Sequence, residues 1–189
     1  MVLAAGLLLL AAAAWRDRQT RRQAEQVLGA PVRTLAPHPL ASPDETQRAA
    51  LAEFRRQATV VDARLADERL ATWAEPATAE VAGAEVLVCA EAPGSLRELA
   101  ASLERAGTRP LVVASPGWAP ELLDLLAAAP GRRCTPLLAG DLAREQLASL
   151  TGATPVTRQD LQSGWAVRCH GRTGRLVADA ETVWLDPQS

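Results

Sequence analysis

The chain has 189 residues, of which 48% are hydrophobic, and a formal net charge of −2 at pH 7. These values are typical of a globular protein with one folded core, and without a basic excess we expect no nucleic-acid partner. The 20 lysine and arginine residues are all arginine. The chain can therefore build neither the lysine contact of a phosphate-binding P-loop nor a lysine Schiff base.

Residues 1–15 contain only apolar residues and glycine, and four arginines follow before position 23. This pattern predicts a membrane anchor, with Trp15 at the interface and the bulk of the chain in the cytoplasm. A helix of this length covers about 22 Å, less than a hydrocarbon core of about 30 Å, so it spans only a thinned bilayer or with further residues before it. A signal peptide and a buried helix of a soluble protein are the alternatives.

Residues 16–57 are predicted to form a helical and proline-rich linker. Its three prolines before position 40 remove backbone donors and favour extended chain. Ser42, Pro43 and Glu45 then fit the N-cap, N1 and N3 positions of a capping box. We expect a helix from this point to about Gln57.

Residues 58–189 carry the pattern of a folded domain. A short strand at 59–61 and an irregular stretch precede the apolar run 85–90, which predicts the first long strand. Ser95 opens a helix as its N-cap, and Gly107 closes it after apolar residues at helical spacing. This segment is the first of several strand–helix units.

Two further strand–helix units follow. The apolar runs 110–114 and 134–139 predict strands, while Pro120 and Asp141 begin helices. Strands that alternate with helices of this length pair in parallel through right-handed crossovers. We expect these strands to form the core of an α/β fold.

The last part of the chain predicts antiparallel strands. Residues 165–170 alternate between two faces like a strand, and 175–178 and 181–185 flank a short turn like the arms of a hairpin. The predicted fold is therefore α/β with an added antiparallel portion, preceded by the N-terminal hydrophobic helix.

No arrangement of residues predicts catalysis. Cys169 and His170 are adjacent, but neighbouring side chains of a strand point to opposite faces, so we expect them to diverge. The three cysteines, the third at position 169, are far apart and odd in number. They predict buried free thiols in a reducing compartment, not a disulfide framework or a metal site. We expect no enzymatic activity, no metal and no cofactor.

Three segments resemble a known family. Residues 86–126 read VLVCAEAPGSLRELAASLERAGTRPLVVASPGWAPELLDLL, with an Arg-Glu pair at 97–98 and an Ala-Gly-x-x-Pro-Leu turn at 106–111. LASLTGATPV follows at 147–156 and GRTGRLVADAETVWLDP at 171–187. In the order of their elements and in their local sequence, these segments resemble the apical domain of GroEL-type group I chaperonins. Nothing in the sequence resembles the equatorial domain, which carries that family's nucleotide site, or the intermediate domain.

The resemblance implies a polypeptide-binding site. In the family, a groove between two helices binds unfolded polypeptide, and the matching helices here begin after Ser95 and at Pro120. The implied binding residues are Ala100, Leu103, Leu122, Leu126 and Ala127, with Trp118 before the second helix and Trp73 beside the groove. For the groove leucines and Trp73 the alternative is packing in the core, which we expect for Leu99, Leu123 and Leu125.

Together these patterns predict a membrane-tethered module that binds unfolded or partner polypeptide without ATP or another nucleotide. One alternative is a scaffolding protein whose groove fits a single partner. The other is a chaperonin-like remnant without a function.

Overall fold

The computed structural model describes residues 42–74, 76–129 and 133–187. The predicted membrane anchor at 1–15 and the first part of the linker lie outside these residues. Within the described ranges, no helix combines the length and the apolar character needed to cross a membrane.

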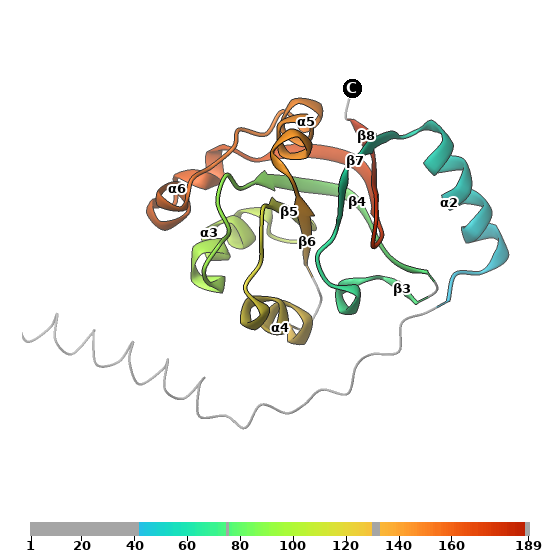
Figure 1. Ribbon diagram of the computed structural model, residues 1–189, viewed down its shortest axis with the longest axis horizontal. Helices are drawn as coiled ribbons and strands as arrows, with labels where there is room; N and C mark the ends of the chain where they lie inside the picture. The colour runs from blue at the N-terminus through green and yellow to red at the C-terminus, as the bar shows by residue number, and fades with distance from the viewer. Residues whose placement is uncertain (1–41, 75, 130–132, 188–189) are drawn as a thin grey trace, which may run out of the picture. The chain divides into compact units, whose positions relative to one another are not determined.

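Three parallel strands form the centre of the molecule (Figure 1). They are β4 (Ala77–Val88), β5 (Leu111–Ser115) and β6 (Cys134–Ala139). Helix α3 (Leu96–Ala106) connects the first strand to the second, and α4 (Pro120–Ala128) connects the second to the third. The predicted strand–helix units are therefore confirmed, although β4 begins eight residues before the expected run at Glu85.

The antiparallel part of the sheet lies on the other side of β4. Strand β7 (Gly171–Ala178) pairs with β4, and β8 (Val183–Pro187) pairs with β7 as the predicted hairpin. Beyond β8 lies β1 (Thr59–Val61), which pairs with it antiparallel.

The sheet closes through one bent strand. Within the described residues its order is β1-β8-β7-β4-β5-β6-β2, and β2 is Ala63–Leu65. Strands β1 and β2 lie at opposite ends of this order, yet a single residue, Asp62, separates them in the chain. The segment 59–65 therefore pairs with β8 through its first half and with β6 through its second half. We call this segment the bent strand.

Three more α-helices, two short 3₁₀ helices and one two-residue strand complete the described fold. They are α2 (Glu45–Gln57), η1 (Glu68–Leu70), β3 (Trp73–Ala74), α5 (Asp141–Thr151), α6 (Arg158–Ser163) and η2 (Trp165–Arg168). Strand β3 extends the sheet by a short antiparallel pairing with the start of β4.

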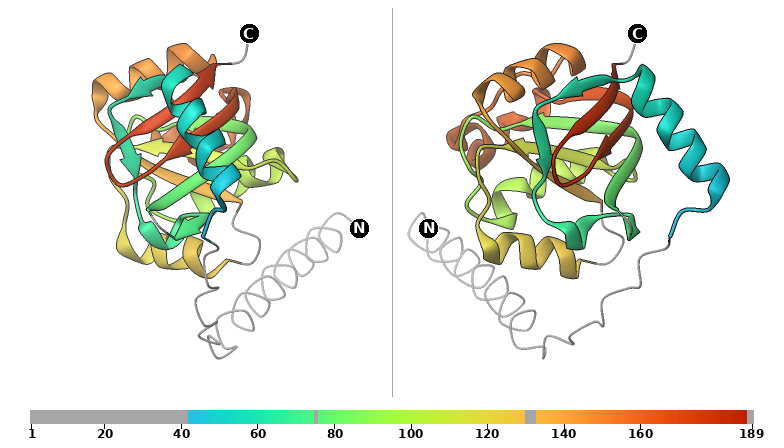
Figure 2. Two further views of the ribbon diagram at one scale, coloured as in Figure 1. Left: turned by 90° about the vertical axis from the view of Figure 1, so that its right-hand side faces the viewer. Right: turned by 45° about the vertical axis from the view of Figure 1, so that its right-hand side comes forward.

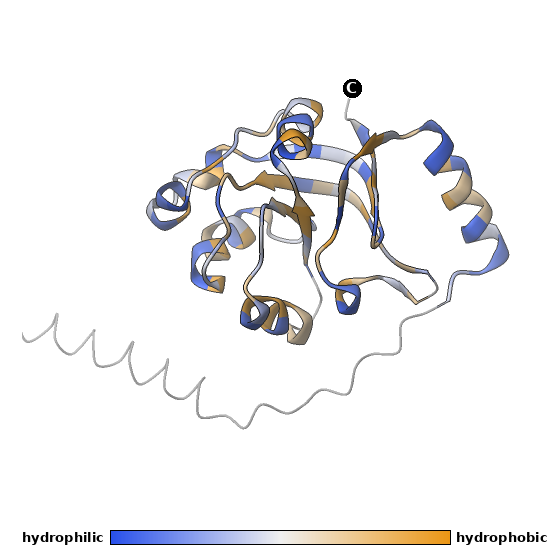
Figure 3. Cartoon of the chain, in the orientation of Figure 1, coloured by the Kyte–Doolittle hydropathy of each residue, from blue (hydrophilic) through white to orange (hydrophobic). Residues whose placement is uncertain are grey.

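Alternate residues of the central strands face two separate cores. In β4, Val86 and Val88 pack in a first core with Leu147 of α5, whereas Leu87 packs in a second core with Leu99 of α3. Because the central strands are buried on both faces, they read as continuous apolar runs, which appear orange in Figure 3.

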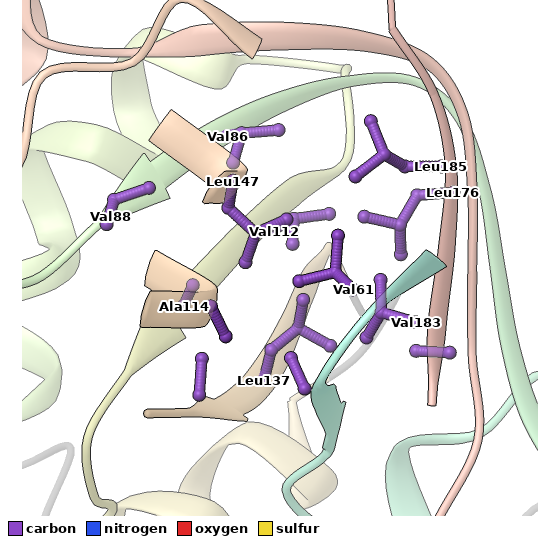
Figure 4. Close-up of a cluster of buried hydrophobic side chains, with 14 of the residues drawn as sticks. Val61, Val86, Val88, Val112, Ala114, Leu137, Leu147, Leu176, Val183 and Leu185 are labelled. Carbon is purple, nitrogen blue, oxygen red and sulfur yellow. The ribbon is translucent and has the colours of Figure 1, made fainter. Parts of the chain in front are cut away.

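The first core lies inside the closed sheet. Figure 4 shows Val61 of the bent strand among side chains of β6, β7 and β8, including Leu137, Leu176 and Leu185. All four residues are fully buried. The bent strand therefore covers one face of the central sheet.

Two glycines let the end of α5 meet the start of β7. Gly152 ends α5 in the left-handed region, with φ 71°, where a residue without a Cβ is favoured. A Cβ at Gly171 would lie 2.5 Å from the carbonyl oxygen of Thr151 and 2.6 Å from the amide nitrogen of Ala153. The backbone approach at this point therefore requires glycine at position 171.

Two sequence predictions, one for residues 165–170 and one for the start of α2, are wrong. Residues 165–168 form the 3₁₀ helix η2 and not a strand, because Gly164 turns the chain at φ 76° immediately before it. The N-cap of α2 is Asp44 and not Ser42. The Asp44 carboxylate accepts from the Gln47 amide while the Gln47 side chain accepts from the Asp44 amide.

Helix α2, which the sequence placed in the linker, packs against the hairpin side of the domain (Figure 2). The Arg55 guanidinium lies 3.2 Å from Asp179 and 4.2 Å from the centre of the Trp184 ring. In return, Arg175 of β7 lies 4.4 Å from the centre of the Phe54 ring. Two arginine–aromatic contacts and one ion pair therefore join α2 to the hairpin.

The bent strand offers a matched pair for a stability measurement. Val61 is fully buried and Val60 is 55% exposed. Because truncation of Val61 removes buried methyl groups and leaves a cavity, Val61→Ala should lower the free energy of unfolding by about 2 kcal/mol. Val60→Ala should change it by about 0.5 kcal/mol or less. Urea denaturation measures both, and equal losses would contradict closure of the sheet through this strand.

Candidate polypeptide-binding site

Helices α3 and α4 lie on the same face of the central sheet. Both connect neighbouring parallel strands, and both contribute side chains to the second core. Helix α5 contributes to the first core, on the other face. The two helices that the sequence singled out therefore share one face of the domain, as Figure 1 shows.

Two of the predicted binding residues lie in the second core. Leu122 and Leu126 of α4 are only 2% and 4% exposed, because their spacing of four residues places them on the helix face toward the sheet. Their predicted contact with polypeptide stays a prediction. In the described conformation they offer it almost no surface.

The other predicted helix residues are partly exposed. Leu103 and Ala127 pack at the margin of the second core and remain half-buried, as does Ala100. Among the residues expected in the core, Leu99 is fully buried and Leu123 half-buried.

For Leu125 the prediction of a core position is wrong, since its side chain is 55% exposed. It stands on a flank of α4 beside the inward-facing pair Leu122 and Leu126. The sequence showed four leucines in this helix but not which of them faces solvent.

Trp118 is anchored beneath the start of α4. Its indole Nε1 donates a hydrogen bond of 3.0 Å to the carbonyl oxygen of Leu137 in β6, and the side chain packs against the second core. A buried indole needs such an acceptor. Trp118 therefore holds the turn between β5 and α4 in place, and only part of its ring remains accessible.

Trp73 lies apart from α3 and α4. It belongs to β3, its indole Nε1 donates a 3.1 Å hydrogen bond to Glu80, and its side chain shares a pocket with Leu51 of α2. The structure thus places five of the seven predicted residues in or against the second core, Ala100 on the same helix as Leu103, and Trp73 on a different surface.

A buried network fixes α3 to the sheet. The Nδ1 of His170 lies 2.7 Å from a carboxylate oxygen of Glu85 in β4, and its Nε2 lies 3.0 Å from the hydroxyl of Ser102 in α3. Arg109 and Arg105 approach the same carboxylate from the surface, at 3.4 and 3.7 Å. The network satisfies buried polar groups and links three segments that are distant in sequence.

The order carboxylate, imidazole, hydroxyl is that of a hydrolytic triad. Here Ser102 is 1% exposed and the His170 side chain 2%, so the hydroxyl has no path to a substrate in the described conformation. Cys169 takes no part in it, because its Sγ contacts the carbonyl oxygen of Trp165 at 4.0 Å. Sequence reasoning missed the network, since its members lie up to 85 residues apart.

Arg69 joins η1 to the outer face of α4. It forms ion pairs of 2.6 Å with Asp67 and 2.8 Å with Asp124. The hydrogen bond from Arg69 lowers the pKa of the Asp67 carboxyl below its ordinary value. These contacts link η1 to α4, the helix that carries Leu125.

The cysteines behave as core residues. Burial raises the pKa of the Cys89 and Cys134 thiols to about 12, and it raises the pKa of Cys169 as well. Such thiols remain protonated at neutral pH and are poor nucleophiles. Among the residues that the structure describes, no group of three or more histidine, cysteine and acidic side chains could hold a metal ion.

Two solved structures share this arrangement of strands and helices. One is the open-state monomer of a group II chaperonin from Methanococcoides burtonii, with a TM-score of 0.50 and 14% identity over 70% of this chain. The other is a chaperonin from the bacteriophage EL (Pseudomonas aeruginosa), with a TM-score of 0.52 and 15% identity, also over 70% of this chain. The fold is chaperonin-like.

The likeness concerns the fold of one part of those proteins. The matched region makes up 31% and 29% of the two chaperonin chains, so this chain corresponds to less than a third of either. No protein-family model and no curated protein matches it. One neighbour is a group II chaperonin and the other a phage chaperonin, so the more specific prediction of a group I apical domain stays a prediction.

The buried thiols predict a loss of stability at alkaline pH. The folded-state pKa of Cys89 and Cys134, about 12, lies above the ordinary value of 9.0. The stabilisation by these protonated thiols is therefore complete below about pH 9. It is lost as the pH rises toward 12, because the thiols of the unfolded chain release protons that those of the folded protein keep, which lowers the free energy of unfolding. The sequence has neither lysine nor tyrosine, so cysteines are the only side chains that titrate in this window.

We expect the urea midpoint to fall between about pH 8.5 and pH 10.5, and to fall less steeply in the Cys134→Ala variant than in the wild type. Denaturation curves followed by circular dichroism at both pH values provide the measurement. Parallel declines in the two proteins would show that this thiol does not carry the effect.

Proposed function

We propose that this protein is a polypeptide-binding module that resembles a chaperonin apical domain and acts without ATP. The observation that carries the proposal is the chaperonin-like fold of the described chain, in which α3 and α4 lie on one face of the sheet. The absence of lysine from the sequence excludes a P-loop and supports the ATP-independent form of the proposal. The module binds its polypeptide without chemical conversion.

The binding surface that we propose is the exposed margin of α3 and α4. Leu125 supplies a large exposed apolar side chain on α4, and Leu103 and Ala100 supply smaller apolar surface on α3. Exposed leucines contact apolar segments of an unfolded chain without a specific sequence, because burial of apolar area is not directional. Leu122 and Leu126 support this surface from below.

The proposal is tested by suppression of aggregation. The full chain should reduce light scattering from a chemically unfolded client, such as citrate synthase diluted from guanidinium, in the absence of nucleotide. Leu125→Glu should weaken this effect about tenfold in the concentration required, because it places a charge where apolar contact forms.

Leu142→Glu is the matched control, since Leu142 of α5 is 82% exposed and belongs to the helix of the other core. Both variants change an exposed helical leucine, so both should fold. Equal activity of the two variants would reject the proposed surface, and no activity of the wild type would reject the proposed function.

We further propose that residues 1–15 tether the module to a membrane and leave the remainder in the cytoplasm. The apolar run followed by arginines supports this proposal. After alkaline carbonate extraction of membranes, the full chain should remain in the pellet. Recovery in the supernatant would contradict a spanning helix.

A further inference from the structure

Exposed arginines surround the carboxylate of Glu85. The guanidinium groups of Arg109 and Arg105 lie 3.4 and 3.7 Å from its oxygens, and their side chains are 53% and 47% exposed, whereas that of Glu85 is only 5% exposed. Arg172 of β7 lies directly opposite Glu85 in the antiparallel pair, so its side chain points to the same face of the sheet. Arg172 is exposed and has no ion-pair partner among the residues that the structure describes. The negative charge is therefore recessed here, and the positive charge lies at the surface.

An exposed tryptophan adjoins these arginines. Trp165 of η2 is 52% exposed, and the Cζ of Arg168 lies 4.9 Å from the centre of its ring. Helix η2 packs against α3, and His170, which follows η2 in the chain, lies 2.7 Å from Glu85. The surface therefore combines one aromatic ring with four arginines. We call it the basic patch, and its residues are Trp165, Arg168, Arg105, Arg109 and Arg172.

The charge of the patch is opposite in sign to that of the whole chain. Residues 96–110 and 157–173, which contribute the patch, contain six arginines and three acidic residues. Together with Glu85 they carry a net charge of +2, whereas the whole chain carries −2. Two of the acidic side chains already accept hydrogen bonds from the backbone, Glu98 from Gly94 and Asp160 from Thr157. The patch therefore attracts an anionic partner.

We propose that the basic patch docks the domain on an anionic lipid surface, with Trp165 among the headgroups and the arginines on the lipid phosphates. Tryptophan is enriched at the interface between lipid and water, because its ring is apolar and its indole N–H is polar. A guanidinium presents paired donors that match the oxygens of a phosphate. The two residue types of the patch are therefore suited to a layer of anionic headgroups.

The choice of a lipid surface as the partner rests on the membrane tether proposed above. Residues 16–41 span at most about 90 Å even when fully extended, so a domain anchored through residues 1–15 stays close to the headgroups. The cytoplasmic leaflet, which the proposed orientation places beside the domain, carries anionic lipids. A free acidic polypeptide has no such advantage in local concentration.

Docking through the patch leaves the proposed polypeptide-binding surface accessible. Leu103 and Arg105 are two residues apart on α3, so their side chains point about 200° apart around the helix axis. Glu98, which accepts a hydrogen bond from Gln162 of α6, lies on the same flank as Arg105, because seven residues make about two turns. Lipid and polypeptide are therefore bound on opposite flanks of one helix.

The test measures whether the patch lies close to lipid headgroups. The full chain with Thr108→Cys is labelled with bimane maleimide and added to vesicles in which part of the phosphatidylcholine carries a nitroxide on its headgroup. Thr108 is exposed between Arg105 and Arg109, and the three native thiols are buried, so the label reports on the patch.

The nitroxide should quench this label about twofold more in vesicles with about 30% phosphatidylglycerol than in vesicles of phosphatidylcholine alone. Salt at about 0.5 M should remove the difference, because it screens the charges. The same label at Leu142→Cys is the control for position, since Leu142 of α5 is 82% exposed and belongs to the helix of the first core. It should show no difference between the two kinds of vesicle.

Two double variants, each labelled at position 108, provide the decisive comparison. Arg109→Gln with Arg172→Gln should lose the additional quenching in anionic vesicles. Arg48→Gln with Arg56→Gln removes the same charge from exposed positions of α2 and should keep it. Circular dichroism verifies that both variants fold. Equal quenching in the two kinds of vesicle, equal quenching at positions 108 and 142, or an unchanged difference in the first variant would each overturn the proposal.

Flotation of the same samples separates the docking from the tether. If the chain does not float with neutral vesicles, the tether fails, and quenching in anionic vesicles still supports or rejects the docking. If the chain floats with both kinds of vesicle and quenching is equal, the docking fails while the tether holds. A label that responds to polyglutamate but is not quenched by anionic vesicles would assign the patch to acidic polypeptide and overturn the lipid proposal.

Discussion

The bent strand is the constraint on which the rest of the domain depends. Seven residues pair with β8 at one end and with β6 at the other, so they join the two ends of the sheet. Two helices contact this strand or its neighbours. The side-chain amide of Gln146 in α5 donates a hydrogen bond to the carbonyl oxygen of Val60. The backbone amide of Leu65 donates to the carbonyl oxygen of Asp179, and the Asp179 side chain forms the ion pair with Arg55 of α2. A sheet with unpaired ends would expose backbone groups to other chains, and here both ends are joined by covalent continuity.

The bent strand covers one face of the central sheet, and α3 and α4 cover the other face. The first core is enclosed by strands and α5, whereas the second core is covered only by helices and short turns. The His170 network contacts Ser102 in the middle of α3, Arg69 contacts Asp124 in the middle of α4, and buried leucines of both helices pack on the sheet. The binding surface that we propose on these helices requires no rearrangement of the described chain, because Leu125 is already exposed.

The parts of this fold that sequence predicts are those with a local signal. Apolar runs such as 110–114, and the caps at Ser95 and Gly107, define the parallel strands and their helices without reference to distant residues. Strand β2 escaped prediction because it is three residues long with an exposed arginine at its centre, and it exists only through pairing with β6. The contact of α2 was missed for a related reason, since arginines stacked on aromatic rings leave no apolar periodicity in the sequence. At the candidate site, composition identified the leucine-rich helix, but helix rotation decided which leucine is exposed, and rotation is fixed by tertiary packing.

The two halves of the bent strand pair with strands that are synthesised at different times. Strand β2 needs β6, which follows it by about seventy residues, whereas β1 needs β8, the last strand of the described chain. During synthesis the parallel centre can therefore assemble while β1 still lacks its neighbour. Pairings of such long sequence separation are slow to form. Until β8 has been synthesised, Val61 and the strands around it remain uncovered, so the nascent domain exposes the apolar surface that becomes the first core.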